Sequence, residues 1–331
     1  MNFIQIKKLL IGLKENVSLK LYTSFKIGGK ARYFYIANSQ EQIKNALKVS
    51  KRLKIPFFIL GGGTNILVSD NGFNGLVIKL NNKKLVFDKK RPQVIFAEAG
   101  VSLGRILSLA KRKGLTGLEW AAGIPGTLGG AIRGNAGAFG GSISQVVRKI
   151  RLLDIRNQKI KIREIKPEEA KFSYRNSIFK KDKNLVILSA ELELKRGDIE
   201  KINNKISQYL NYRKRTQPLN FFSSGSIFKN IAKKSLTKDS LKKIKKLLDK
   251  DKFYLLKQEL IPAGLLIQIC GLKGMKIGQA MVSEKHCNFI VNLGRAKADD
   301  VLILISLIKQ QVRDKLGIQL EEEIVYVGFK S

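Results

Sequence analysis

The sequence predicts an α+β protein of two or three domains. The chain has 331 residues, of which 44% are hydrophobic, so it can bury more than one core. Its first eighty residues alternate strand-like and helix-like segments, and the later regions again mix short strands with helices. We expect a first lobe at 1–80, a second lobe at 81–216 and a third domain at 217–323, with the tail 324–331 able to pack back on the first lobe.

The elements of the first lobe follow from residue type and spacing. Residues 25–37 have the aromatic and branched content of strands, and FFIL at 57–60 resembles a buried strand. Between them, Ser39 and Gln42 form a capping box, and apolar residues then recur at helical spacing from 43 to 53. The turn GGGTN follows the second strand.

The later elements are read in the same way. A helix is expected at 101–114, ending at Gly114, and a lysine-rich helical region at about 233–257. The last helix should run from Asp299 or Asp300 to Gly317, with its acidic residues at the positive end of the helix dipole. The sequence LEEEIVYVGF, from 320 to 329, predicts a closing strand.

The formal net charge of +37 raises the question of a nucleic-acid-binding protein. However, the lysines are spread along nearly the whole chain and occupy solvent faces of predicted helices, as at 240–252. We therefore favour a solvated surface, with attraction of anionic substrates as the alternative.

Several classes of protein are disfavoured by what the sequence lacks. The longest strongly apolar segment, 301–308, is far shorter than the roughly 20 residues of a membrane-spanning helix, and residues 1–20 do not resemble a secretory signal. Cys270 and Cys287 have no CxxC spacing and are interpreted as reduced core residues. We expect a cytoplasmic protein.

Two glycine clusters are the main candidates for a binding site. They are GGGTN at 61–65 and AGIPGTLGG at 122–130, and neither is a Walker loop or a GxGxxG fingerprint. Glycine lets amide N–H groups approach an anion without a side chain in the way, so a diphosphate would fit both clusters. Tight turns with close strand packing are the alternative. Asn135 adds an amide at a second backbone-rich stretch, for a ligand or for turn formation.

The catalytic candidates are few. His286 is the only histidine, and the chain has no HExxH motif, cysteine cluster or GxSxG elbow, so neither metal hydrolysis nor a serine-histidine mechanism is expected. Cofactor chemistry remains, supported by Tyr174 and Arg175, by Ser226 and by the acidic run that ends at Glu323. Each of these also has a plain structural reading. If the face that Glu323 shares with Val325 and Val327 is buried, its carboxylate is desolvated.

Seven blocks together resemble the UDP-N-acetylenolpyruvoylglucosamine reductases, from about Tyr22 to Gly328. The blocks are TSFKIGG, LGGGTNILVSDNGFNGLVI, GLEWAAGIPGTLGGAIRGNAGAFGG, FSYRNSIFK, SGSIFKN, PAGLLIQICGLKG with SEKHCNFIVN, and LEEEIVYVG. The resemblance implies a two-lobed FAD-binding domain of the vanillyl-alcohol-oxidase type plus a C-terminal α+β substrate-binding domain. It also implies NADPH as the hydride donor and UDP-N-acetylglucosamine enolpyruvate as the substrate, which is reduced to UDP-N-acetylmuramate in peptidoglycan precursor synthesis.

The same resemblance assigns the site residues. In similar proteins the two glycine clusters hold the pyrophosphate of a non-covalent FAD. The residues at the matching positions are Gly61, Gly62, Gly63, Thr64, Asn65, Gly123, Ile124, Pro125, Gly126, Gly129 and Asn135. Arg175 matches the arginine that binds the substrate carboxylate, Ser226 the proton donor to C2, and Glu323 the glutamate that assists the arginine.

Substrate contacts transfer less directly, because the spacing between Arg175 and Ser226 resembles the subgroup without an extra substrate-clamping loop. By position in their blocks, the candidates are Tyr174, Lys229, Asn230, His286 and Asn292. The chain departs from the usual family pattern at Arg133, Ile231, Leu265 and Gln268. We expect these departures to change affinity or stability more than activity.

Three other hypotheses stay open at this point. One is an oxidase on the same flavin scaffold, which is disfavoured because both cysteines and the histidine lie beyond residue 269, away from any covalent flavin attachment in the lobes. The second is a nucleic-acid binder that has kept the fold, and the third is a degenerate enzyme. Our expectation is a monomer acting on a UDP-sugar, with no metal, no nucleic acid and no membrane span.

Overall fold

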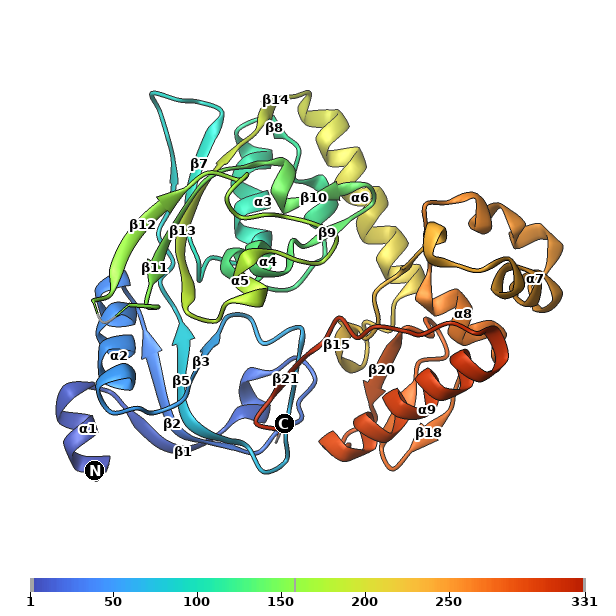
Figure 1. Cartoon of the computed structure of the whole chain (residues 1–331). Helices are drawn as coiled ribbons and strands as arrows, with labels where there is room; N and C mark the ends of the chain where they lie inside the picture. Colours follow the sequence, from blue (N-terminus) through green and yellow to red (C-terminus); the bar gives the residue numbers. More distant parts are fainter. Residues whose placement is uncertain (1–2, 158, 330–331) are drawn as a thin grey trace. The chain divides into compact units, whose positions relative to one another are not determined.

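The chain folds into two compact units. The computed structural model describes residues 3–157 and 159–329 (Figure 1). Unit 1 comprises Met1–Val17, Ala31–Gly62 and Asn74–Arg213, and unit 2 comprises Ser18–Lys30, Gly63–Phe73 and Lys214–Ser331. The chain therefore passes between the units several times, and each unit is described by itself.

The first sheet of unit 1 has four strands in the order β1 (Lys14–Ser18), β2 (Lys30–Ala37), β5 (Phe73–Leu80) and β3 (Phe57–Leu60), with β3 parallel to β5. Helices α1 (Phe3–Leu9) and α2 (Gln40–Arg52) accompany it. The expected helix start is confirmed, because the Ser39 hydroxyl accepts a bond from the Gln42 amide at 3.2 Å. Gln42 completes the cap by accepting from the Asn38 amide at 2.7 Å.

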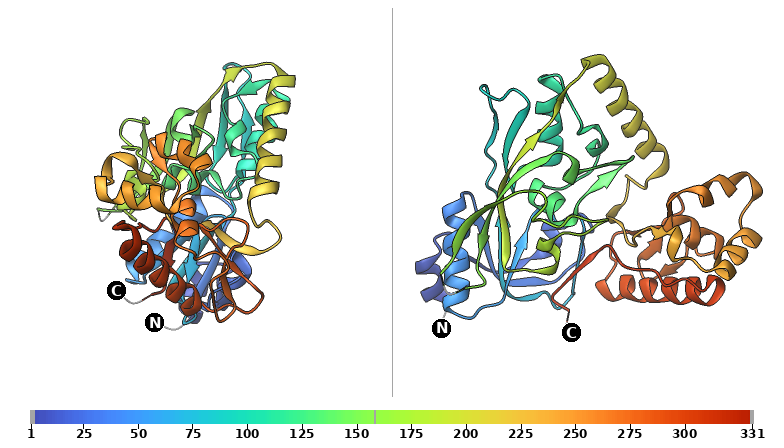
Figure 2. Two further views of the ribbon diagram at one scale, coloured as in Figure 1. Left: turned by 90° about the vertical axis from the view of Figure 1, so that its right-hand side faces the viewer. Right: turned by 45° about the horizontal axis from the view of Figure 1, so that its top comes forward.

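The second sheet of unit 1 is antiparallel. Its order is β12 (Lys161–Ile165), β11 (Val147–Asp154), β13 (Leu185–Glu193), β7 (Val94–Glu98) and β6 (Leu85–Phe87). Helices α3 (Leu103–Arg112) and α4 (Leu128–Gly134) cover one of its faces, as Figures 1 and 2 show. The short helix α5 (Ile178–Lys181) packs on β13. Buried residues of both sheets belong to one continuous core, which fixes the loops between them.

Short elements complete unit 1. The long helix α6 (Ile199–Thr216) belongs to unit 1 up to Arg213, and its last three residues belong to unit 2. The short elements are β8 (Leu115–Thr116), the 3₁₀ turns η2 (Glu119–Ala121) and η3 (Ile143–Gln145), β9 (Gly137–Ala138), β10 (Gly141–Ser142) and β14 (Lys195–Arg196).

Unit 2 is built around a four-stranded antiparallel sheet. Its order is β15 (Phe222–Ser226), β20 (Phe289–Asn292), β19 (Ala280–Val282) and β18 (Lys276–Ile277), and α9 (Ala298–Leu316) packs on β18 and β19. Helices α7 (Lys238–Leu247) and α8 (Ala263–Ile269) also contact α9 (Figure 1). The smaller elements are η1 (Leu19–Tyr22), β16 (Ile231–Ala232), η4 (Lys233–Ser235), η5 (Lys250–Lys257) and β17 (Leu260–Ile261).

The closing segment joins distant parts of the sequence within unit 2. Strand β21 (Val325–Val327) lies parallel to β4 (Ile66–Val68), so the end of the chain extends the segment that follows GGGTN. Of the expected tail 324–331, residues 330 and 331 lie outside the described residues.

The observed elements confirm the α+β class and correct several boundaries. The last helix ends as expected at Gly317, and α3 ends just before Gly114. The expected strand at 25–37 begins at Lys30, and the lysine-rich region is α7 followed by a 3₁₀ turn. The closing strand spans three residues, and before it Glu322 forms a single bridge with Phe228. Glu321, Glu322 and Glu323 therefore lie before the closing strand rather than within it.

In the portion that the structure describes, no helix has both the length and the apolar character needed to cross a membrane. The same residues contain no group of three or more His, Cys, Asp or Glu side chains arranged to hold a metal ion.

Candidate active site

The two glycine clusters meet in unit 1. A side-chain carbon added at Gly61 would lie 2.7 Å from the Thr127 hydroxyl oxygen, so the turn after β3 runs directly against the loop before α4. Gly129 lies close to Ala99, since a side-chain carbon added there would be 3.0 Å from the Ala99 Cβ. The amino group of Lys79 donates to the Gly61 carbonyl. Glycine is needed at positions 61 and 129 because a side chain there would collide with the neighbouring chain segment.

Where the two glycine clusters touch, the Thr127 hydroxyl is buried without a hydrogen-bond partner in the described residues. A buried hydroxyl that makes no hydrogen bond costs about 1–3 kcal/mol. A ligand with acceptor oxygens beside the two glycine turns would satisfy it.

Arg213 lies beside the same loop and was not predicted from the sequence. Its Nε donates to the Ala122 carbonyl at 2.8 Å, and a side-chain carbon at Gly123 would lie 2.9 Å from its Cδ. The side chain is 8% exposed, and Nη2 has no partner in the described part of the chain. Burial lowers the pKa of this guanidinium from its usual value, yet arginine stays protonated.

Nothing in the local sequence distinguishes Arg213 from its neighbours in YRKRT. A signal did exist at longer range, since Arg213 shares the helical spacing of Ile202, Ile206 and Tyr209, the inward-facing side of α6. Its guanidinium also lies 5.1 Å from the centre of the Phe139 ring. This placement makes it a buried cation next to bare backbone, a combination that suits a phosphate.

The second part of GGGTN belongs to unit 2. The Gly63 carbonyl accepts from the Ser24 amide at 3.0 Å. The Asn65 side-chain amide donates to the Glu323 carbonyl at 3.2 Å, and the Asn65 carbonyl accepts from the Val325 amide at 3.1 Å. Asn65 therefore fixes the segment that carries Glu323, besides its expected role in binding the cofactor.

Arg175 lies in unit 1, in a tight turn with left-handed backbone at φ +54°. Its Nη2 donates to the Gly137 carbonyl at 2.7 Å, and its backbone carbonyl accepts from the Lys180 amino group at 3.2 Å. The Asn135 amide donates to the Ser173 carbonyl at 2.9 Å, which ties this turn to the glycine-rich segment. A non-glycine residue held in this conformation is strained, as is common at functional sites.

Ser226 is placed by a bulge in unit 2. Along β15 Ser223 and Ser226 are three positions apart, whereas their partners Val291 and Phe289 on β20 are two positions apart. Gly225 takes up the extra residue with φ +81°, and a side-chain carbon there would meet nothing within 4 Å. Because of the bulge, the Ser226 side chain lies on the opposite face of the sheet from the one it would occupy in a regular strand. The space beside Gly225 is open.

Glu323 lies next to the Ser226 segment. Its backbone amide donates to the Ile227 carbonyl at 2.7 Å, and the adjacent Glu322 bridges Phe228. The condition set for a desolvated Glu323 is met only in part. Val327 is buried, but Glu323 and Val325 are both partly exposed, because the strand on this side is so short.

The predicted substrate contacts also lie in unit 2, apart from Tyr174, which is 40% exposed in unit 1. Lys229 pairs with Glu321 at 2.8 Å, and the Asn230 side chain accepts from the Ala263 amide at 3.2 Å. Asn292 is buried and binds backbone groups on both sides, donating to the Phe25 carbonyl at 3.0 Å and accepting from two amides. Their roles toward a substrate remain predictions.

The four departures from the family pattern fall into different surroundings. Leu265 is buried in the core of unit 2, and Gln268 is exposed. Ile231 pairs with Ile261, where a proline could not donate to a neighbouring strand. Burial lowers the pKa of Arg133, whose carbonyl accepts from the Ser177 hydroxyl at 2.7 Å.

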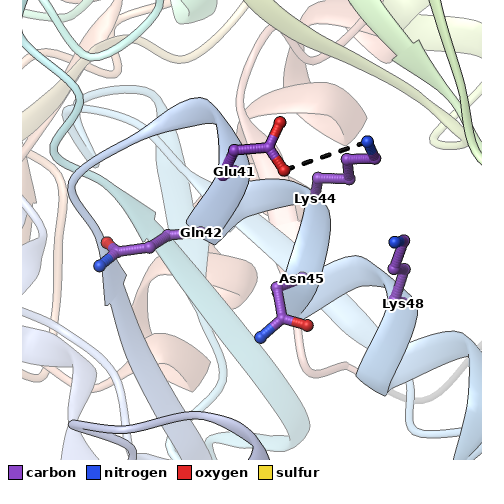
Figure 3. A pocket seen from close by; sticks show the side chains of 5 residues that line it. All are labelled: Glu41, Gln42, Lys44, Asn45 and Lys48. Atoms are coloured by element: carbon purple, nitrogen blue, oxygen red, sulfur yellow. Dashed lines mark ion pairs between the residues drawn. The ribbon is translucent and has the colours of Figure 1, made fainter.

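Two surface hollows are lined by residues other than the predicted site residues. The first, of about 360 Å³, lies on α2 and is lined by Glu41, Gln42, Lys44, Asn45 and Lys48. Figure 3 shows that all of these side chains come from this one helix. The Lys44 amino group lies 4.0 Å from a carboxylate oxygen of Glu41. The second, of about 440 Å³, borders the closing segment, and there Lys309 pairs with Glu322 at 2.7 Å. Burial, with a smaller contribution from Glu322, raises the pKa of Tyr326 in this hollow to about 12.

Comparison with known proteins decides the family. Residues 31–161 match the family model described as FAD binding domain, and residues 217–327 match the one described as UDP-N-acetylenolpyruvoylglucosamine reductase, C-terminal domain. The UDP-N-acetylenolpyruvoylglucosamine reductase of Caldanaerobacter subterraneus subsp. tengcongensis is 42% identical over 99% of both chains. The chain belongs to the UDP-N-acetylenolpyruvoylglucosamine reductase family.

Two further members of this reductase family support the assignment. The Clostridium novyi protein is 38% identical over 96% of this chain and 93% of its own. The crystal structure of the reductase from Thermus caldophilus superimposes with a TM-score of 0.73 and 30% identity, covering 95% of this chain and 99% of that one. The family resemblance expected from the seven blocks is thus confirmed.

The residues of unit 1 fit the FAD that the reductase family implies. The matched FAD binding domain contains both glycine clusters, and it contains Thr127 with its unsatisfied hydroxyl. The Arg213 guanidinium, from outside that match, adds a buried positive charge beside the second cluster. Donors and charge of this kind are what a diphosphate needs.

His286 is expected to make the stability of the reductase depend on pH. Burial lowers its pKa from 6.5, and Nδ1 accepts from the Asn288 amide at 3.3 Å. As the pH falls through 6.5, His286 of the unfolded chain binds a proton before His286 of the folded protein does, and this favours the unfolded chain. The free energy of unfolding is therefore highest above pH 6.5 and decreases as the pH falls toward the folded-state pKa.

Thermal melting should show this loss between about pH 7.5 and pH 5.5, the window in which unperturbed histidine titrates. We expect the melting temperature of the wild type to fall more across that window than that of His286→Gln. Because this is the only histidine in the chain, equal falls in the two proteins would contradict the assignment.

Proposed function

We propose that this protein reduces UDP-N-acetylglucosamine enolpyruvate to UDP-N-acetylmuramate with electrons from NADPH, a step of peptidoglycan precursor synthesis. The observation that carries this proposal is relatedness to these reductases along nearly the whole chain, together with a FAD binding domain whose bare backbone and buried arginine suit a diphosphate. We further propose that it acts as a monomer in the cytoplasm and binds no nucleic acid.

We assign FAD binding and substrate binding to different regions of the chain. Residues 1–80 and 81–216 are proposed as the two lobes that hold FAD, and residues 217–323 as the substrate-binding domain. The cofactor-binding residues are proposed to be the two glycine clusters with Asn135, and to these we add Thr127 and Arg213 on the strength of their buried, unsatisfied polar atoms.

Bound FAD, held by the two glycine clusters with Thr127 and Arg213, would supply the redox chemistry, as hydride acceptor from NADPH and hydride donor to C3 of the enolpyruvyl group. The protein must then manage the charge that this leaves at C2, which spreads into the neighbouring carboxylate. Arg175 offers a planar fork of N–H donors for that carboxylate, and Glu323 is proposed to assist in polarising it. Ser226 gives its proton to C2, which completes the addition of two hydrogens across the double bond.

A serine can fill this role because the developing carbanion is a strong base. The structure adds two supporting features, the bulge that turns Ser226 and the open space at Gly225 through which a ligand can approach. Lys229, Asn230, His286, Asn292 and Tyr174 are proposed to contact the UDP-sugar.

An anaerobic experiment tests the function. The flavin-loaded protein is reduced with NADPH, UDP-N-acetylglucosamine enolpyruvate is added, and the flavin absorbance is followed. We expect reoxidation without oxygen, with one lactyl ether formed per flavin. A flavin that stays reduced until oxygen is admitted would support an oxidase instead, and a protein that retains DNA in a salt-sensitive manner but binds no flavin would support the nucleic-acid alternative.

A further inference from the structure

The Asn288 side chain binds both backbone polar groups of Phe228, which lies two residues after Ser226. Its side-chain oxygen accepts from the Phe228 amide at 2.9 Å, and its side-chain nitrogen donates to the Phe228 carbonyl at 2.9 Å. Its own backbone carbonyl accepts from the Ile227 amide at 2.8 Å. Asn288 is 3% exposed, so these bonds form away from water.

This contact replaces sheet pairing where the sheet ends. The β15–β20 ladder has its last pair at Ser226 and Phe289, immediately after the bulge at Gly225. Among the described residues, no strand pairs with residues 227 and 228 beyond this pair on that side, and there the Asn288 side-chain amide binds Phe228 as a peptide group would. The bulge alone would leave the position of Ser226 loosely defined.

The same two residues support Glu323 from their other side. The Ile227 carbonyl accepts from the Glu323 amide at 2.7 Å, and Phe228 bridges Glu322. The strip 227–228 thus lies between Asn288 and the closing segment. A displacement of this strip would move Ser226 directly and Glu323 through one hydrogen bond.

We propose that Asn288 is a positioning residue for the reaction, acting through residues 227 and 228 on the proton donor Ser226 and on Glu323. This inference rests on the proposed function of Ser226. Asn288 itself does not touch the substrate in this account, because its amide is fully directed at Phe228.

Asn288→Asp tests the proposal with the least change of shape. The acceptor for the Phe228 amide stays, whereas the donor to the Phe228 carbonyl becomes a repelling oxygen. Asn288→Ser, with a shorter uncharged side chain, is the second variant in case the aspartate protein does not fold. We expect substrate-driven reoxidation of the flavin to slow about 10- to 100-fold, since small misplacements of reacting groups have effects of this size.

Two readouts separate positioning from general loosening of the fold. Reduction of the flavin by NADPH should keep its wild-type rate, because it does not use Ser226. The solvent deuterium isotope effect on reoxidation should rise as protonation becomes slower. Ile308→Ala removes buried core volume from α9 in the same unit and serves as the control, lowering the melting temperature without this pattern.

A double variant gives the decisive comparison. In a Ser226→Ala background, loss of Asn288 should add clearly less slowing than it causes in the wild type, because one of the two groups it positions, the proton donor, is gone while Glu323 remains. Additive effects, equal slowing of both half-reactions, or wild-type reoxidation in Asn288→Asp and Asn288→Ser would each overturn the proposal. If wild-type protein itself fails to be reoxidised by the UDP-sugar, the proposed function has failed instead.

Discussion

Ser226→Ala is expected to slow reoxidation of the reduced flavin by UDP-N-acetylglucosamine enolpyruvate by about 10²- to 10⁴-fold, the usual contribution of a positioned general acid. The NADPH half-reaction should be unaffected, because no proton has to reach C2 there. Rapid-mixing absorbance measurements under anaerobic conditions follow each half-reaction separately. The loss should appear in the maximal rate rather than in the substrate concentration that gives half of it.

Ser224→Ala is the matched control for this experiment. Ser224 lies two residues earlier on β15, is 2% exposed, and its hydroxyl has no hydrogen-bond partner in the described residues. Its removal should therefore leave folding and both rates nearly unchanged. If Ser226→Ala and Ser224→Ala turn over alike, the proton donor lies elsewhere.

Arg213→Met is expected to weaken FAD binding about 10- to 100-fold. A hydrogen bond to a charged group contributes about 1.5–3 kcal/mol, and each 1.4 kcal/mol corresponds to a factor of about ten in affinity. Methionine keeps much of the volume beside Gly123 but removes the guanidinium that Ala122 and the Phe139 ring now contact. Quenching of free FAD fluorescence during titration of the apoprotein measures the affinity without reference to activity.

Arg215→Met provides the comparison, since Arg215 is exposed and two residues further along α6. It changes the net charge by the same amount, so any general electrostatic attraction of FAD is matched. An equal loss of affinity in both variants would show that Arg213 acts through the overall charge of the protein, and an unchanged affinity in Arg213→Met would remove it from the site.

Local signals in the sequence were sufficient for the start of α2 and the end of α9, whereas α6 was not expected from the sequence. Ser39 caps α2, and Gly317 ends α9 in the left-handed conformation, because caps and turns depend on a few neighbouring residues. The length of the closing strand was overestimated because strand length depends on distant rather than neighbouring residues. Alternating residues describe a strand, but its length depends on how far a distant partner extends, and β4 has three residues.

The candidate site divides in the same way. Glycine-rich motifs and block order pointed to the loops proposed to bind the cofactor, whereas the burial of Arg213 and the contact of Gly61 with Thr127 depend on segments far apart in the chain. The bulge before Ser226 could not be foreseen either. The stretch SSGS allows a regular strand or an extra residue, and the pairing with β20 decides between them.

The division of unit 2 into three stretches of sequence affects how the protein is made. Strand β4 emerges from the ribosome early, but β21, its parallel partner, starts at residue 325, which is 325 − 66 = 259 positions after Ile66. During synthesis the early stretches must wait for nearly the whole chain, and such long-range pairing folds slowly. A fragment ending at residue 213 would lack most of unit 2, including this partner strand. Premature termination should therefore give an aggregation-prone product rather than a working flavin domain.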